Sequence, residues 1–194
     1  MIRKFLRQFF TVPNQFTLLR LAFVPFAAGA ILDQHYGKAL IIFILAALSD
    51  LLDGLLARLL HQRTVLGQYL DPIADKLLLS TLFIVLSAVH KIPWRVTVWV
   101  FTRDVFIVII AGVLFATVGF RDFRPTLFGK VNTGVQIATL LVVLLYDVYP
   151  QPWLFYTRRV GLWSTIALAI LSGMHYAWMI GTRVRERQSA AAGD

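Results

Sequence analysis

Six long apolar stretches, separated by short polar breaks, dominate the hydrophobic pattern of the chain. Each is long enough to cross the hydrocarbon core of a bilayer, which takes about 17–25 residues as an α-helix. The pattern therefore predicts an all-α polytopic membrane protein with six transmembrane helices. Because the loops are short and no repeat is evident, we expect residues 1–194 to form a single membrane domain. The six stretches run over about 17–33, 39–60, 68–90, 94–119, 128–149 and 160–181.

The two ends of the chain are polar and lie outside these stretches. The start, M-I-R-K-F-L-R-Q-F-F, mixes basic and apolar residues, so residues 1–13 are expected to form an interfacial amphipathic helix. Residues 182–194 are expected to form a polar, frayed tail. Neither a cleavable signal nor a long transit sequence stands out, which favours a bacterial inner membrane over an organelle.

Composition agrees with the membrane prediction. Of 194 residues, 58% are hydrophobic, and the mean hydropathy is +0.72. The net charge of +9 is expected to serve topology and contact with anionic lipids, so we expect no nucleic-acid partner. The chain has no cysteine, which excludes disulfides and thiol chemistry.

Lysine and arginine are distributed unevenly between the two sides of the predicted bundle. With the N-terminus inside, cytoplasmic segments hold eleven of them and the opposite loops hold five, which predicts that both termini lie in the cytoplasm. The cytoplasmic set is Arg3, Lys4, Arg7, Arg58, Arg63, Arg121, Arg124, Lys130, Arg183, Arg185 and Arg187, and the opposite set is Lys38, Lys91, Arg95, Arg158 and Arg159.

Four aspartates interrupt the second and third apolar stretches, toward their predicted cytoplasmic ends. A charged acid at the centre of a membrane helix costs about 2.5–3.5 kcal/mol, so four unpaired acids would cost roughly 10 kcal/mol. Bound divalent cations are the simplest way to neutralise them, and ligands that offer only oxygen favour Mg²⁺ or Mn²⁺ over zinc. The four acids are Asp50, Asp53, Asp71 and Asp75.

The spacing of these acids places them on shared helix faces. The first two are three residues apart and the last two are four apart, so each pair lies on one face of its helix. Two helices can therefore present two carboxylates each to one pocket. Small residues beside the acids would leave room there for a ligand. These small residues are Gly54, Ala57 and Gly67.

Other interpretations of the acids fit less well. Pairing with Arg58 and Lys76 could offset two charges, but not four. A divalent-cation transporter or channel would place acids through the whole membrane depth, whereas these lie toward one side. An intramembrane prenyltransferase would have paired D-x-x-x-D motifs on well-separated helices.

A second polar group follows in and after the fourth stretch. Arg103 and Asp104 are adjacent, and side chains of helical neighbours point about 100° apart, so we do not expect them to pair face to face. They are expected to have either a role in the site or a role in interhelical bonding. Basic residues such as Arg124 and Lys130, on the side of the acids, suggest phosphate binding.

The acidic stretch resembles the signature of the CDP-alcohol phosphatidyltransferase family. The pattern D-x-x-D-G-x-x-A-R, eight residues, then G-x-x-x-D-x-x-x-D matches at all eight positions, and P-N-x-x-T-x-x-R at 13–20 resembles the family's entry to its first span. T-R-D-V at 102–105 and R-P-T-L-F-G-K-V-N-T-G-V-Q at 124–136 are most similar to the cardiolipin synthases of this family. The eight matching residues are Asp50, Asp53, Gly54, Ala57, Arg58, Gly67, Asp71 and Asp75.

The resemblance implies a metal-dependent transferase of phospholipid biosynthesis that forms a homodimer. It implies a CDP-diacylglycerol donor and two Mg²⁺ or Mn²⁺ ions held by the four aspartates. The expected acceptor is phosphatidylglycerol, which would give cardiolipin and CMP. The alternative acceptor is glycerol 3-phosphate, as in phosphatidylglycerophosphate synthases.

The resemblance also implies roles for single residues, in a site that faces the cytoplasm. Asp75 is expected to act as general base in addition to binding metal. The donor is expected to contact Asp53, Gly54, Ala57, Arg58 and Gly67. We further expect the acceptor to contact Arg103, Asp104, Arg124 and Lys130.

Overall fold

The computed structural model describes residues 12–59, 65–118 and 127–191, and all regular structure in these ranges is helical. The predicted all-α class is thus confirmed for this part of the chain, and the first five helices begin and end within a few residues of the predicted stretches. Of the expected interfacial helix, residues 1–11 lie outside the described ranges and the last two residues begin α2. The helices are α2 (Val12–Leu32), α3 (Tyr36–Leu59), α4 (Val65–Ala88), α5 (Trp94–Val118), α6 (Leu127–Val148) and α7 (Pro152–Ala191).

Apolar composition marks the chain as a multi-pass membrane protein. Within the described ranges, three helices contain segments long and apolar enough to cross a bilayer. These segments are Gln15–Leu32, Leu127–Val148 and Pro152–Met179.

The last helix is longer than predicted. It begins at Pro152, ends at Ala191 and has 40 residues. Proline suits the first position of a helix because its missing N–H has no partner to lose there. Residues 182–191 of the expected polar tail continue α7, and the arginine, glutamate, glutamine and alanine of this segment favour helix.

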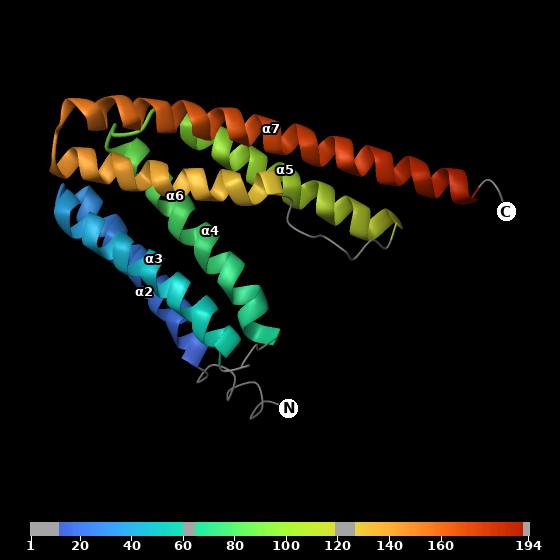
Figure 1. Ribbon diagram of the computed structural model, residues 1–194, viewed down its shortest axis with the longest axis horizontal. Helices are drawn as coiled ribbons and strands as arrows, with labels where there is room; N and C mark the ends of the chain where they lie inside the picture. Colours follow the sequence, from blue (N-terminus) through green and yellow to red (C-terminus); the bar gives the residue numbers. More distant parts are fainter. Residues whose placement is uncertain (1–11, 60–64, 119–126, 192–194) are drawn as a thin grey trace.

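Successive helices run in alternating directions and form two groups (Figure 1). Helices α3 and α4 pack against α2, while α5 and α6 pack against α7. Figure 1 shows the first group diverging from the second toward the end where α2 begins. The largest buried apolar side chains lie toward the other end, so the core closes that end and leaves the diverging end open. They include Phe43, Phe83, Leu86, Ile92 and Leu144.

Helices α2 and α4 end in the same way at the closed end. Gln34 and His90, which follow them, have φ values of 59° and 60°, in the left-handed region that closes many helices. After α2, the N–H of His35 donates to the carbonyl of Ala30 at 2.8 Å, which satisfies one of the last carbonyls of the helix. Both turns are therefore fixed by backbone bonds, although neither position is glycine.

A cluster of charged residues joins four segments at the closed end. Lys91, between α4 and α5, lies 2.9 Å from Oδ1 of Asp147 in α6, and the side chain of Asp147 is only 5% exposed. The Lys91 ammonium lies 4.6 Å from the centre of the Tyr36 ring. Arg158 of α7 donates to the Lys91 carbonyl. We call Tyr36, Lys91, Asp147 and Arg158 the Lys91 cluster.

Candidate active site

One arginine of α2 brings together acids from two other helices. Nη2 of Arg20 lies 2.7 Å from Oδ1 of Asp50 in α3, and Nη1 bonds to Oδ1 of Asp75 in α4. One turn earlier in α2, the hydroxyl of Thr17 donates to Oδ1 of Asp71 at 2.5 Å. The structure thus gathers three of the four predicted aspartates, with α2 between their helices. We call these five residues the acid site.

The sequence of α2 explains how it reaches both partners. Thr17 and Arg20 are three residues apart, and the same face continues through Ala27 and Ile31, all of them buried. The face is therefore polar where the acids lie and apolar where the core lies. An apolar α2 face packs on α3 and α4, and this packing carries Arg20 to the acids.

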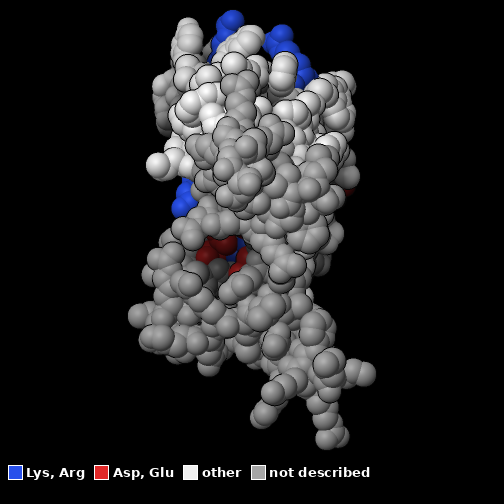
Figure 2. Space-filling model, turned by 90° about the vertical axis from the view of Figure 1, so that its right-hand side faces the viewer, with Lys and Arg blue, Asp and Glu red and all other residues white. Residues whose placement is uncertain are grey.

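The acids of this site are open to their surroundings, whereas the arginine is not. The side chains of Asp50 and Asp75 are 49% and 40% exposed, and that of Arg20 is 1% exposed. Figure 2 shows acidic side chains at the floor of a hollow in one face of the molecule. A cation that approaches this site would therefore meet carboxylate oxygens before it meets Arg20.

Sequence reasoning underestimated how the protein itself neutralises these acids. Lys76, considered as a counter-ion for them, instead lies 3.0 Å from Oδ2 of Asp104. Arg20 takes that role for Asp50 and Asp75. The sequence does contain a signal for this role, because an arginine inside the first apolar stretch needs a partner for its charge. The prediction used Arg20 only as part of a family motif.

Several predicted site residues lie where the structure does not describe side chains. The residues predicted to bind the donor are described by their helical backbone only, and Arg124 lies outside the described ranges. Lys130 is described and exposed, in the first turn of α6. The residues known by backbone alone are Asp53, Gly54, Ala57 and Arg58 in α3 and Gly67 in α4.

The carboxylate oxygens of the acid site are of a type that binds a hard divalent cation. Carboxylate oxygens are the preferred ligands of Mg²⁺ and Mn²⁺. Two of the carboxylates already surround the guanidinium of Arg20, so the space between them accepts positive charge. Among the described side chains, no three potential ligands are close enough together to hold an ion. A complete set would therefore need Asp53 and a rearrangement around Arg20.

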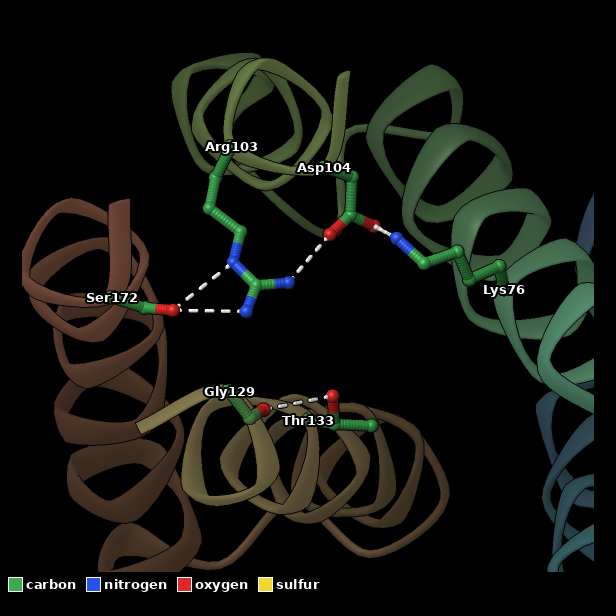
Figure 3. A network of polar contacts seen from close by, with 6 residues as sticks. All are labelled: Lys76, Arg103, Asp104, Gly129, Thr133 and Ser172. Atoms are coloured by element: carbon green, nitrogen blue, oxygen red, sulfur yellow. Dashed lines mark hydrogen bonds and ion pairs between the residues drawn. The ribbon is translucent and has the colours of Figure 1, made fainter. Parts of the chain in front are cut away.

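A second polar network links three helices near this site (Figure 3). Nη1 of Arg103 donates to Oδ1 of Asp104 at 2.7 Å, and the same guanidinium donates to the Ser172 hydroxyl of α7 at 2.9 and 3.3 Å. Asp104 also holds Lys76 of α4. The expectation that Arg103 and Asp104 cannot pair is wrong, because the long arginine side chain folds back toward its neighbour. Of the two roles expected for Arg103 and Asp104, the structure shows bonding between helices.

An apolar groove of about 280 Å³ lies beside this network, between α5 and α7. The Arg103 side chain forms part of its wall, and the remaining lining is almost wholly apolar. A groove of this kind can hold an acyl chain while the guanidinium meets an anionic headgroup. Among the lining residues are Trp99, Phe106, Ala169, Gly173 and Met174.

Comparison with known proteins gives consistent matches over most of the chain. The family model described as CDP-alcohol phosphatidyltransferase matches residues 10–172. A human cardiolipin synthase (CMP-forming) is 32% identical, over 86% of this chain and 61% of that protein. A putative cardiolipin synthase of Mycobacterium tuberculosis is 31% identical, over 87% of this chain and 78% of that protein.

A relative with another acceptor in its name matches as well. CDP-diacylglycerol–glycerol-3-phosphate 3-phosphatidyltransferase of Bacillus subtilis is 28% identical, over 86% of this chain and 93% of that protein. The chain spans about 61% of the length of the human and rat relatives that it matches.

Proposed function

The chain belongs to the CDP-alcohol phosphatidyltransferase family, and we propose that it transfers a phosphatidyl group from CDP-diacylglycerol to phosphatidylglycerol, giving cardiolipin and CMP. The observation that carries this proposal is the gathering of Asp50, Asp71 and Asp75 around Thr17 and Arg20 of α2. Relatives named cardiolipin synthase support the choice of product.

The proposed enzyme is a single membrane domain of the bacterial inner membrane and acts as a homodimer. Six helices cross the bilayer, an interfacial helix precedes α2, both termini lie in the cytoplasm, and the acid site faces the cytoplasm. The lengths of α3, α4 and α5 support this arrangement, since 24–25 helical residues span about 36 Å.

Two Mg²⁺ or Mn²⁺ ions are proposed to bind the aspartates, as divalent-metal dependence is typical of the family. When bound, such ions neutralise the diphosphate of the donor and polarise its phosphoryl oxygens. The proposed metal ligands are Asp50, Asp53, Asp71 and Asp75. The cytidine diphosphate is proposed to lie against Asp53, Gly54, Ala57, Arg58 and Gly67.

The proposed reaction is a direct displacement at phosphorus. The primary hydroxyl of the acceptor forms a bond to the phosphorus that carries diacylglycerol, and the bond from that phosphorus to CMP breaks. Asp75 accepts the hydroxyl proton, and CMP leaves with the bonding electrons. The exposure of Asp75 makes its carboxylate reachable, and its bond to Arg20 holds the carboxylate in a fixed orientation.

The groove beside Arg103 supports a lipid acceptor. Three of the five N–H groups of this guanidinium are used in bonds to Asp104 and Ser172, so two remain for the acceptor's phosphate. Asp104 is proposed to hold Arg103 there, with Lys130 and Arg124 adding positive charge. Glycerol 3-phosphate, the alternative acceptor, would have no use for an apolar groove; the Bacillus subtilis relative is the observation in its favour.

The test offers both acceptors to purified protein with CDP-diacylglycerol and Mn²⁺, and identifies the lipid product by mass spectrometry. Cardiolipin is expected. Phosphatidylglycerophosphate as the sole product would contradict the proposal and favour the alternative acceptor, and cation flux into liposomes without CMP release would favour a transporter.

A groove variant sharpens this test. A Cβ added at Gly173 meets no atom within 4 Å, so we expect Gly173→Leu to extend into the groove that Gly173 lines. We expect it to slow cardiolipin formation, while Gly29→Leu, which is equally open but lies on α2, keeps the wild-type rate. Equal rates for the two variants would show that the groove does not hold the acceptor.

A further inference from the structure

A second pocket, of about 200 Å³, lies at the closed end of the molecule, between the start of α5 and residues 159–166 of α7. It is remote from the acid site, and none of the proposed chemistry uses it. Two of its lining residues are arginines, one from each side of the pocket. The lining residues are Pro93, Arg95, Val96, Arg159, Leu162, Trp163 and Ile166.

The two arginines of this pocket differ from the other arginines with described side chains. Arg20, Arg103 and Arg158 all bond to carboxylates, hydroxyls or carbonyls. Within the described ranges, Arg95 and Arg159 have no ion pair or hydrogen bond, and Arg95 only lies over the Trp163 ring, 5.3 Å from its centre. Two guanidinium groups that line one pocket repel each other, and an anion between them would turn the repulsion into attraction.

The surroundings of the pocket indicate its depth in the membrane. Exposed aromatic side chains with a polar edge surround this end of the helices, as at the boundary between acyl chains and headgroups. Lipid phosphates lie at this level. The exposed aromatic residues are Trp94, Tyr149, Trp153, Tyr156 and Trp163.

The pocket also has an apolar side. Leu162 and Ile166 continue from Arg159 along α7, away from the closed end and toward the middle of the helix. A volume of about 200 Å³ is below the roughly 300–1,000 Å³ of sites that enclose a whole small molecule. It therefore suits part of a headgroup whose acyl chains lie outside, along the helix.

We propose that this pocket binds the phosphate of an anionic phospholipid from the leaflet opposite the acid site. Arg95 and Arg159 donate to the phosphate oxygens, Trp163 covers the headgroup, and one acyl chain lies along Leu162 and Ile166. The net charge of +9 favours an anionic lipid over a zwitterionic one.

The test measures lipid binding to the purified full chain by native mass spectrometry, without CDP-diacylglycerol or metal, so that its outcome does not depend on catalysis. Dioleoyl phosphatidylglycerol is compared with dioleoyl phosphatidylcholine, in the Gly173→Leu background so that binding in the groove beside Arg103 does not contribute. Arg159→Gln is expected to weaken phosphatidylglycerol binding about tenfold, because it removes a charge-assisted contact. Lys38→Gln removes the same charge from an exposed residue at the same end and is expected to leave binding unchanged. Equal binding by the two variants would overturn the proposal.

A second measurement leaves both arginines in place. In protein labelled with 5-fluorotryptophan, with the signals assigned by Trp163→Phe and Trp178→Phe, phosphatidylglycerol should shift the ¹⁹F resonance of Trp163 before that of Trp178, which lies farther along α7 and is 69% exposed. Equal shifts at the two positions would contradict the proposal. So would an equal Trp163 shift with phosphatidylcholine, or with the same concentration of inorganic phosphate.

Discussion

The acid site and the Lys91 cluster both pair aspartates with basic residues between helices, but they bury opposite partners. In the Lys91 cluster the carboxylate of Asp147 is 5% exposed and the cation, Lys91, is 32% exposed. In the acid site Arg20 is 1% exposed, while Asp50 and Asp75 are 49% and 40% exposed. A pair that hides its acid can only hold helices together. A pair whose acids are exposed can also bind a cation or accept a proton.

The largest predicted effect separates the two regions by activity. Asp75→Asn should lower CMP release by roughly 10²–10⁴-fold, the range expected when a general base is lost. Asp147→Asn, at the closed end, should keep the activity per folded molecule. The assay measures CMP release by each variant and divides it by the amount of folded protein, which size-exclusion chromatography gives. Similar activity losses in the two variants would erase the functional distinction between the regions.

A variant of the Lys91 cluster should lose stability. Lys91→Met leaves the buried carboxylate of Asp147 without its ammonium partner, and we expect a loss of roughly 2 kcal/mol, below the cost of breaking a fully buried pair because Lys91 is partly exposed. Thermal unfolding of purified protein measures this loss. Lys38→Met, at an exposed position of the same end, is the control and should unfold near the wild-type temperature.

Removal of the buried cation should change how the acid site responds to metal. In Arg20→Gln, the carboxylates of Asp50 and Asp75 lose their guanidinium partner, so Mn²⁺ should raise the unfolding temperature more than it does in the wild type. Arg158→Gln, which alters the Lys91 cluster, should show the wild-type shift. An Mn²⁺ shift in Arg20→Gln that is no larger than the wild-type shift would mean that the cation and the arginine do not share these acids.

The smallest predicted effect is a gain in stability at the closed end that leaves activity unchanged. Gln34 has a φ of 59°, a conformation that glycine adopts without the steric cost of a Cβ. Gln34→Gly should therefore raise the free energy of unfolding by about 0.5–1 kcal/mol and leave CMP release unchanged. Gln15→Gly, at an exposed position inside α2, should instead destabilise the protein.

Hydropathy alone predicted the first five helices to within a few residues, because apolar stretches with short breaks leave little choice of boundary. It missed both ends of α7, which extends past the arginines that flank its apolar stretch. The spacing of the aspartates predicted that acids from the second and third stretches meet. The pattern did not reveal that Arg20 lies between them, since the contact joins residues 55 positions apart and depends on how α2 packs. It also missed the Arg103–Asp104 pair, because helix geometry fixes the direction of a Cβ but not of a long side chain.

The most direct test of the central claim is CMP release from CDP-diacylglycerol and phosphatidylglycerol by the purified chain, first in excess chelator and then after Mn²⁺ is added back. If the aspartates act through bound divalent cations, release should stop in chelator and return with Mn²⁺ in the wild type, but not in Asp71→Asn. Full CMP release in excess chelator would contradict the account.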